Sequence, residues 1–170
     1  FAEGGQLVAN MSDGEPLLPA NYWFIFELAR KSGKQGLPLL LFTNGINLDE
    51  EMLSYLERVT DGKISYCISM QTGIPERYGN FMLSDKEPNH TGERLFGKLE
   101  EKLEVWRQYD EQVKAKTGKY AIAIHTYVIP DKTTEEDLKK LKEIIERLGN
   151  VPWIVSTMGA HVYQSMAGKT

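Results

Sequence analysis

Polar residues suited to ligand binding follow a short apolar segment near the start of the chain, in the turn Ser12-Asp13-Gly14-Glu15-Pro16. Pro16 removes one backbone donor and stiffens the chain, and Gly14 allows the backbone to come close to a ligand. A free carbonyl beside Glu15 would then be able to receive an ammonium group. The same residues also suit a plain strand-to-helix turn with a proline near the helix start, so the turn alone leaves both interpretations open.

Four further apolar segments end in small polar residues of the same kind. In parallel α/β folds the carboxyl ends of the strands meet at one edge, where functional residues gather. Each group alone is weak evidence, because loops need polar turn residues anyway. Their recurrence predicts one shared ligand site, formed by the first turn together with Thr43-Asn44-Gly45 and residues 69–73, 125–127 and 156–159.

Histidine and carboxylate residues raise the alternative of a divalent metal site. His90, His125 and His161 could combine with Glu15 or Asp131, as in barrel hydrolases. The sequence contains no His-x-His pair or other close ligand spacing, so we predict no metal ligand in this chain. We expect His125 instead to line a pocket or to make a hydrogen bond.

The elements that must position these groups alternate between strand-like and helix-like segments. Short continuous apolar runs indicate buried strands, and leucines at helical spacing indicate amphipathic helices. Thr134 and Asp137 have the spacing of a capping box at the start of the last helix. We expect strands over residues 6–11, 37–42, 63–70, 120–129 and 151–157, and helices over residues 19–31, 49–59, 93–116 and 135–148.

This regular alternation indicates an α/β fold with five parallel strands joined by right-handed helical crossovers. An open doubly wound sheet and part of an α/β barrel both satisfy the order. The 170 residues fit a single domain. Residues 71–92 are expected to form a long loop that is either functional or mobile, and residues 158–170 show no clear pattern.

The composition narrows the classes of partner and compartment. A formal net charge of -4 argues against nucleic acid and anionic membranes as partners, since both attract a basic surface. Cys67 is the one cysteine, so an intramolecular disulfide is excluded and a reducing compartment, the cytoplasm, is expected. The sequence shows no signal peptide and no apolar run near the ~20 residues that span a bilayer.

Four segments, taken in order, resemble the core domain of radical S-adenosylmethionine (SAM) enzymes. Asp13-Gly14-Glu15-Pro16 is similar to the Gly-Gly-Glu-Pro element of that family, and the strand ending in Thr43-Asn44-Gly45 is similar to its next strand. Ile68-Ser69-Met70 resembles a strand whose small hydroxyl residue faces the cofactor, and Val128-Ile129-Pro130-Asp131 resembles the fifth unit. The resemblance implies a partial (β/α) TIM-type barrel of about five parallel strands with outer helices.

The resemblance also implies two cofactors and their contacts. In this family a [4Fe–4S] cluster cleaves SAM reductively, and the radical that results abstracts hydrogen from the substrate. By position, Ser69 would lie near the ribose or carboxylate of SAM, and Thr43 and Asn44 would line the cavity. The methionine ammonium of SAM would meet the first turn, which consists of Ser12, Asp13, Gly14, Glu15 and Pro16.

The sequence departs from the family at two points. Asp13 replaces the first glycine of the Gly-Gly-Glu-Pro element, and the Cys-x3-Cys-x2-Cys loop that binds the cluster is missing. Cluster iron needs thiolate ligands, and Cys67 alone cannot replace three of them, so we expect it to be a packing residue. We therefore expect residues 1–170 to be an internal part of a longer radical SAM protein, with the preceding strand and cluster loop as their partner.

Three functional hypotheses follow. The first is a radical SAM enzyme acting on a small molecule or peptide that the sequence does not identify. The second is a catalytically inactive barrel that serves as a binding or scaffold module. The third is a metal-dependent barrel hydrolase. A cysteine loop in sequence preceding Phe1 would favour the enzyme over the scaffold.

The number of cysteines generates a prediction for the cluster. This chain, reconstituted with iron and sulfide under anaerobic conditions, should bind no stoichiometric [4Fe–4S] cluster, because it carries one cysteine where three thiolates are needed. The measurement is the absorption spectrum after desalting, together with iron and sulfide analysis. A cluster absorption band that survives desalting would contradict this prediction.

Overall fold

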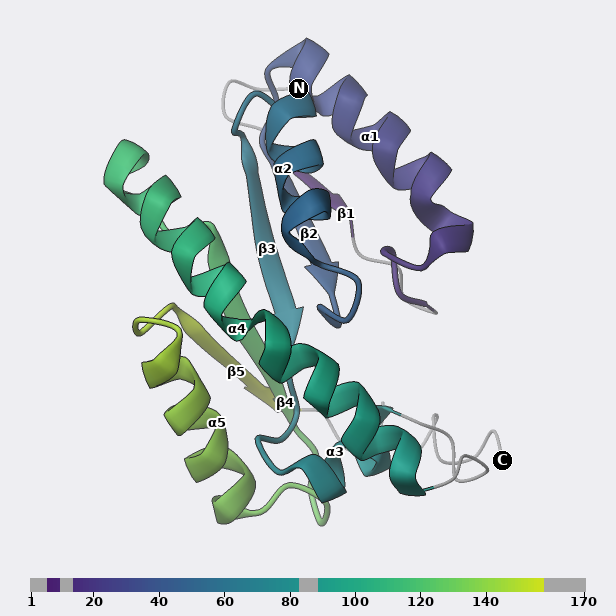
Figure 1. The fold of residues 1–170 in the computed structure, drawn as a ribbon, viewed down its shortest axis with the longest axis vertical. Helices are drawn as coiled ribbons and strands as arrows, with labels where there is room; N and C mark the ends of the chain where they lie inside the picture. Colours follow the sequence, from purple (N-terminus) through teal and green to yellow (C-terminus); the bar gives the residue numbers. More distant parts are fainter. Residues whose placement is uncertain (1–5, 10–13, 83–88, 158–170) are drawn as a thin grey trace.

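Five parallel strands form one sheet, and they lie side by side in the order of the sequence (Figure 1). The structure is a computed structural model that describes residues 6–9, 14–82 and 89–157. It confirms the α/β fold with parallel, sequentially ordered strands. The strands are β1 (Leu7–Ala9), β2 (Leu39–Thr43), β3 (Ile64–Ser69), β4 (Ile122–Val128) and β5 (Trp153–Thr157).

Helices connect successive strands and flank the sheet (Figure 1). Right-handed crossovers between sequential parallel strands place their helices on the same face of a sheet. No helix within the described ranges is both long and apolar enough to cross a membrane. The helices are the 3-10 helix η1 (Pro19–Asn21) and the α-helices α1 (Tyr22–Gln35), α2 (Glu50–Val59), α3 (Pro75–Met82), α4 (Asn89–Thr117) and α5 (Glu135–Arg147).

The two faces of the sheet differ in their packing. Leu41, Tyr66 and Ile124 are fully buried on the face that packs against the helices. Because successive side chains of a strand point to opposite faces, the alternate residues form a second face, called the open face below. Two of its residues at the sheet edges, Val8 and Ile154, are 56% and 46% exposed. The strand registers assign to the open face Val8, Leu40, Phe42, Ser65, Cys67, Ser69, Ala123, His125, Tyr127, Ile154 and Ser156.

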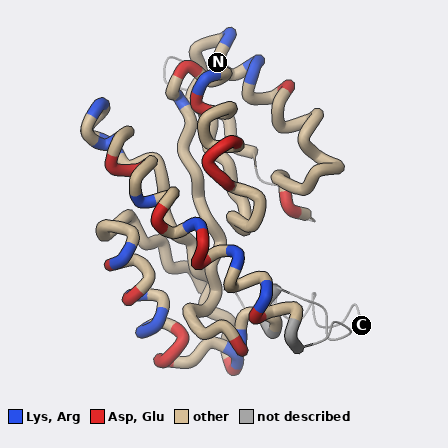
Figure 2. Tube along the Cα trace, in the orientation of Figure 1, with Lys and Arg blue, Asp and Glu red and all other residues tan. Residues whose placement is uncertain are grey.

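Charged residues lie in the helices and loops, and the strands contain no Lys, Arg, Asp or Glu (Figure 2). Burying an unpaired charge in a sheet would destabilise the folded state by more than strand pairing stabilises it. Both faces of the sheet are therefore built from uncharged side chains, which matters for the ligands that the open face can accept.

The sequence predicts a loop over residues 71–92, and this prediction is wrong. Helix α3 occupies the middle of this segment, and α4 begins at Asn89. Tyr78 of α3 is fully buried, and its ring centroid lies 5.6 Å from that of Phe96 on α4. The two backbones also approach closely, since a Cβ added at Gly92 would stand 2.4 Å from the nitrogen of Gly79. Packing against α4 thus stabilises a helix whose own sequence is rich in turn formers.

The first helix also differs from its predicted bounds. The segment predicted to start it at Pro19 forms the short helix η1, and α1 continues to Gln35 instead of ending near residue 31. It ends where Gly36 adopts a left-handed conformation, with φ of 67°. Glycine adopts this conformation without steric cost, so it commonly ends helices.

A buried carboxylate joins α4 to the strand that follows it. Asp110 is 3% exposed, and its Oδ1 accepts hydrogen bonds from the backbone nitrogens of Ala121 (2.7 Å) and Ile122 (2.9 Å). These two amides stand at the start of β4, where the chain turns out of the long helix. Asp110 therefore fixes the point at which β4 enters the sheet.

We predict that Asp110→Ala lowers the free energy of unfolding by about 3 kcal/mol, because it leaves two buried amides without a charged acceptor. Urea unfolding followed by circular dichroism measures the effect. The matched control is Glu111→Ala, which removes an exposed carboxylate paired with Arg107 on the same helix. That variant should be nearly unchanged. Equal stabilities of the two variants would show that Asp110 does not hold the start of β4.

Candidate functional site

The turn after β1 is fastened to the end of β2 by the carboxylate of Glu15. Its Oε1 accepts hydrogen bonds from the Thr43 hydroxyl (2.5 Å) and the Leu17 backbone nitrogen (2.9 Å). Its Oε2 accepts a hydrogen bond from the backbone nitrogen of Asn44 (2.5 Å). Both carboxylate oxygens are thus used inside the protein, and Glu15 acts as a positioning residue for the carboxyl edge of the sheet.

The backbone beside Glu15 is open to a ligand at Gly14. The carbonyl of Glu15 accepts hydrogen bonds from the Asn21 side chain (2.8 Å) and the Leu18 nitrogen (3.2 Å). The neighbouring Gly14 is exposed, and a Cβ added there would meet no heavy atom within 4 Å. A ligand ammonium at this turn would therefore approach at Gly14 rather than at the carbonyl of Glu15.

The Thr43-Asn44-Gly45 turn is shaped by internal contacts. The Thr43 hydroxyl accepts a hydrogen bond from the Gly45 nitrogen (3.1 Å), and the Asn44 Oδ1 accepts one from the Ile46 nitrogen (3.0 Å). Gly45 has φ of 78°, and a Cβ there would stand 2.6 Å from the Trp106 ring. Glycine is required at this position by both its conformation and its neighbour.

The remaining predicted site residues are placed apart from this cluster. Pro16 is buried in the turn after Glu15. Ser69 ends β3 on the open face, partly buried, and its register partner is His125 of β4. Ser12 and Asp13 lie outside the described residues. The structure therefore brings together Glu15, Thr43 and Asn44, whereas Ser69 lies one strand further along the same edge.

A second polar pair, which the sequence did not identify as a unit, joins β4 and β5. The Nε2 of His125 lies 3.0 Å from the hydroxyl of Ser156. The His125 ring packs against Tyr127 (centroids 4.2 Å apart) and Phe42 (6.2 Å). Burial lowers the pKa of His125, because the imidazolium form loses hydration there. The expectation that His125 makes a hydrogen bond is confirmed.

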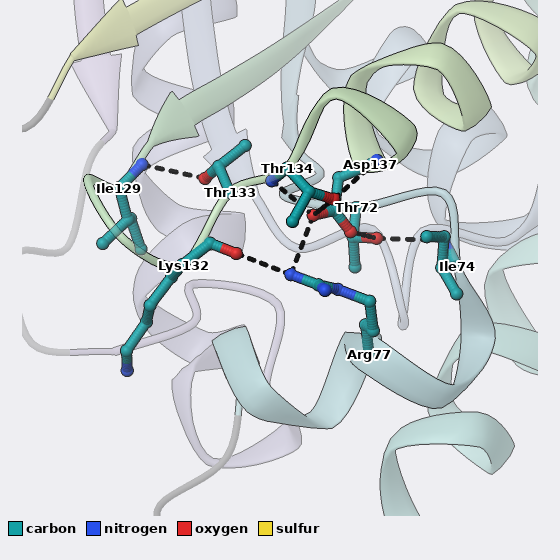
Figure 3. Close-up of polar contacts among 8 residues, drawn as sticks. All are labelled: Thr72, Ile74, Arg77, Ile129, Lys132, Thr133, Thr134 and Asp137. Carbon is teal, nitrogen blue, oxygen red and sulfur yellow. Dashed lines mark hydrogen bonds and ion pairs between the residues drawn. The ribbon is translucent and has the colours of Figure 1, made fainter.

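A third polar group ties the loops after β3 and β4 together (Figure 3). The fully buried Asp137 accepts hydrogen bonds from the hydroxyls of Thr72 (2.5 Å) and Thr134 (2.7 Å) and from the Thr134 nitrogen (2.7 Å). Arg77 of α3 pairs with the same carboxylate at 2.9 Å and donates to the Lys132 carbonyl at 2.5 Å. The predicted capping box at Thr134 is confirmed as part of this network.

This network is structural in character. It connects residues that follow β3, lie in α3 and begin α5, so it holds three segments at the carboxyl edge. Desolvation by itself would raise the pKa of Asp137, but the hydrogen bonds from Thr72 and Thr134 and the charge of Arg77 lower it below its ordinary value. A further hydrogen bond joins β4 to the loop after β3, since the backbone nitrogen of Tyr127 donates to Gln71 Oε1 (2.7 Å).

The residues described by the structure do not suit an iron–sulfur cluster or a metal ion. Cys67 is buried on the open face, and burial raises the pKa of its thiol to about 11, so it is protonated near neutral pH. Among the described residues, no group of three or more His, Cys, Asp or Glu side chains is placed to hold a metal ion. The buried position of Cys67 confirms that it is a packing residue.

Comparison with known proteins does not assign a family. A scan against protein-family models found no matching family, and a search of curated proteins found no relative above the significance threshold. The residues themselves and their arrangement in the fold are therefore what indicates a function.

The Asp137 network predicts how stability depends on pH. The folded-state pKa of Asp137 is lowered, so its contribution is fully present above the ordinary pKa of about 3.9 and is lost as pH falls through the folded pKa. We expect Asp137→Asn to lower the free energy of unfolding at pH 7 by about 3 kcal/mol, and the difference to shrink below about pH 4. Urea unfolding at a series of pH values measures both effects.

The matched control is Glu136→Gln, which changes an exposed carboxylate of the same helix turn. It should leave the stability at pH 7 nearly unchanged. A constant difference between wild type and Asp137→Asn from pH 7 to pH 3 would contradict the assigned pKa direction.

Proposed function

We propose that this chain forms part of the wall of a radical SAM domain and contacts SAM at the carboxyl edge of its sheet. The observation that carries the proposal is the bond between Glu15 and the Thr43-Asn44 turn. These are two of the segments whose sequences resemble the family, and they are adjacent at the carboxyl ends of β1 and β2. The sequential parallel order of the strands is the order found in the wall of a (β/α) barrel.

In this proposal the residues of the chain have different tasks. Glu15 and Thr43 shape the turn, because their polar atoms are used inside the protein. Gly14 offers exposed backbone to the methionine ammonium of SAM, and Ser69 offers a hydroxyl on the open face to its ribose or carboxylate. SAM bound beside a reduced cluster supplies the radical that begins the reaction on a substrate.

The chain does not supply the cluster. Three thiolates are needed, and Cys67 is buried and protonated near neutral pH. In the proposed enzyme the cluster ligands therefore come from a part of the protein outside these 170 residues.

A binding or scaffold module is the second candidate function. The specific observation that favours it is that both carboxylate oxygens of Glu15 are already hydrogen-bonded within the protein. The Asn44 side chain is likewise used, since it accepts from the Ile46 nitrogen. A fold that kept these bonds for stability alone would have the same arrangement without any cofactor.

Calorimetric titration with SAM separates the two candidates. We expect the chain to bind SAM weakly, with a Kd above about 100 μM, because the cluster iron that would hold one side of the cofactor is not part of the chain. The double variant Glu15→Ala, Ser69→Ala should weaken binding at least about tenfold, since it disturbs the turn and removes one hydrogen-bonding hydroxyl.

The matched control is Glu27→Ala, Ser65→Ala, which removes an exposed carboxylate of α1 and another hydroxyl of the open face. It should bind SAM as the wild type does, and circular dichroism checks that both double variants fold. Tight binding unaffected by the Glu15 and Ser69 changes would place SAM elsewhere. Absence of any binding heat would favour the scaffold module.

A further inference from the structure

One ring nitrogen on the open face is buried without a partner. His125 is 6% exposed, and its Nδ1 has no hydrogen-bond partner in the part of the chain that the structure describes. A buried polar atom left without a hydrogen bond destabilises the folded state. Such an atom calls for an explanation, and a missing ligand is one.

The same ring is held firmly on its other side. Nε2 lies 3.0 Å from the Ser156 hydroxyl, and that hydroxyl is able either to donate or to accept. If Ser156 donates, Nδ1 carries the proton and needs an acceptor. If Ser156 accepts, Nδ1 needs a donor. A ligand group that both donates and accepts, such as a primary amide or a hydroxyl, satisfies either tautomer.

The surroundings of His125 on the open face are uncharged. Its neighbours across the sheet are Ser69, Ile154 and Ser156, and the rings of Phe42 and Tyr127 pack against it. An anion or a cation would find no opposite charge among these residues. Apolar and aromatic surfaces favour a ligand body of the same character.

The side chains around the His125 imidazole are only partly buried. Phe42, Tyr127 and Ser156 are all partly exposed, so the side chains that shield the imidazole themselves reach solvent. For a small molecule to reach Nδ1, one of these partly exposed side chains would have to turn aside. Side-chain rotamer changes of this kind are common when a ligand binds.

Other orphaned polar atoms of the described structure are placed differently. The hydroxyls of Tyr66 and Tyr78 belong to fully buried side chains in the packed core. Arg77 has an orphaned Nε, but its guanidinium already binds Asp137 and the Lys132 carbonyl. His125 differs because it lies on the open face opposite Ser69, the last residue of β3, and parallel α/β folds bind ligands at the carboxyl ends of their strands.

We propose that His125, held by Ser156, is the hydrogen-bonding contact for an uncharged small molecule that carries an amide or hydroxyl group on an apolar or aromatic body. The molecule packs against Phe42 and Tyr127 on the open face and satisfies Nδ1. This site is separate from the turn at Glu15, and it does not require that SAM bind to the chain.

The test is a titration with benzamide, observed in long-range nitrogen–proton spectra of the chain labelled with 15N-histidine. Benzamide should shift the His125 nitrogen that does not face Ser156, and the shift should saturate. Benzoate, which has the same shape and a negative charge, should produce at most a tenth of the shift at equal concentration. SAM is titrated into a separate sample.

Variants define the contact. Ser156→Ala should weaken benzamide binding about threefold to tenfold, because the ring loses the bond that orients it. Ser65→Ala, a hydroxyl of the open face at the amino end of β3, should bind as the wild type does. His125→Phe should remove the binding and raise Tm by a few degrees, about 2–4 °C, because the orphaned nitrogen is gone.

Three results would overturn the proposal. One is a His125 spectrum that benzamide leaves unmoved, and another is an equal shift with benzoate. The third is a shift caused by SAM but not by benzamide, which would assign His125 to the SAM site. Failure of SAM to bind while benzamide shifts His125 would leave this proposal supported and count against the proposed function only.

Discussion

The constraint on which the structure depends is the parallel, sequential order of its strands. Each connection must return over the sheet to start the next strand in the same direction, and right-handed crossovers do so over one face. That face becomes the core, where Tyr66 and Trp106 are fully buried. The same constraint places every carboxyl end at one edge and leaves the open face without the connecting helices.

Helix α4 contacts several segments that are distant from it in the sequence. Trp106 donates from Nε1 to the Leu48 carbonyl at 2.7 Å, and Lys102 donates to the Ile46 carbonyl, so the β2–α2 loop rests on this helix. Further along, Asp110 fixes the start of β4, and near its start Phe96 packs against Tyr78 of α3. One helix thus connects the two halves of the sheet.

The polar residues discussed above fall into two kinds according to whether their hydrogen bonds are satisfied. Glu15 and Asp137 are fully engaged with donors of the protein, which explains why they hold loops in place. His125 is engaged on one side and orphaned on the other. Because an unsatisfied buried atom is costly and a satisfied one is not, the second kind is the better indicator of a ligand.

The sequence by itself determined the fold class, the order of the strands and the packing role of Cys67. Apolar runs and helical periodicity are local properties, and strict alternation of strand and helix admits few topologies. It also placed Glu15, Asn44 and Ser69 at strand ends, because a strand end is visible as a change from apolar to polar residues.

Only the tertiary structure decided which of these polar residues meet. The bond from Thr43 to Glu15 spans 28 positions and that from Thr72 to Asp137 spans 65, and no local pattern encodes such pairs. Helix α3 forms because Tyr78 finds a buried place beside Phe96, which outweighs the turn-forming residues around it. The orphaned nitrogen of His125 is likewise a property of its neighbours, since the same residue in a polar loop would bind water.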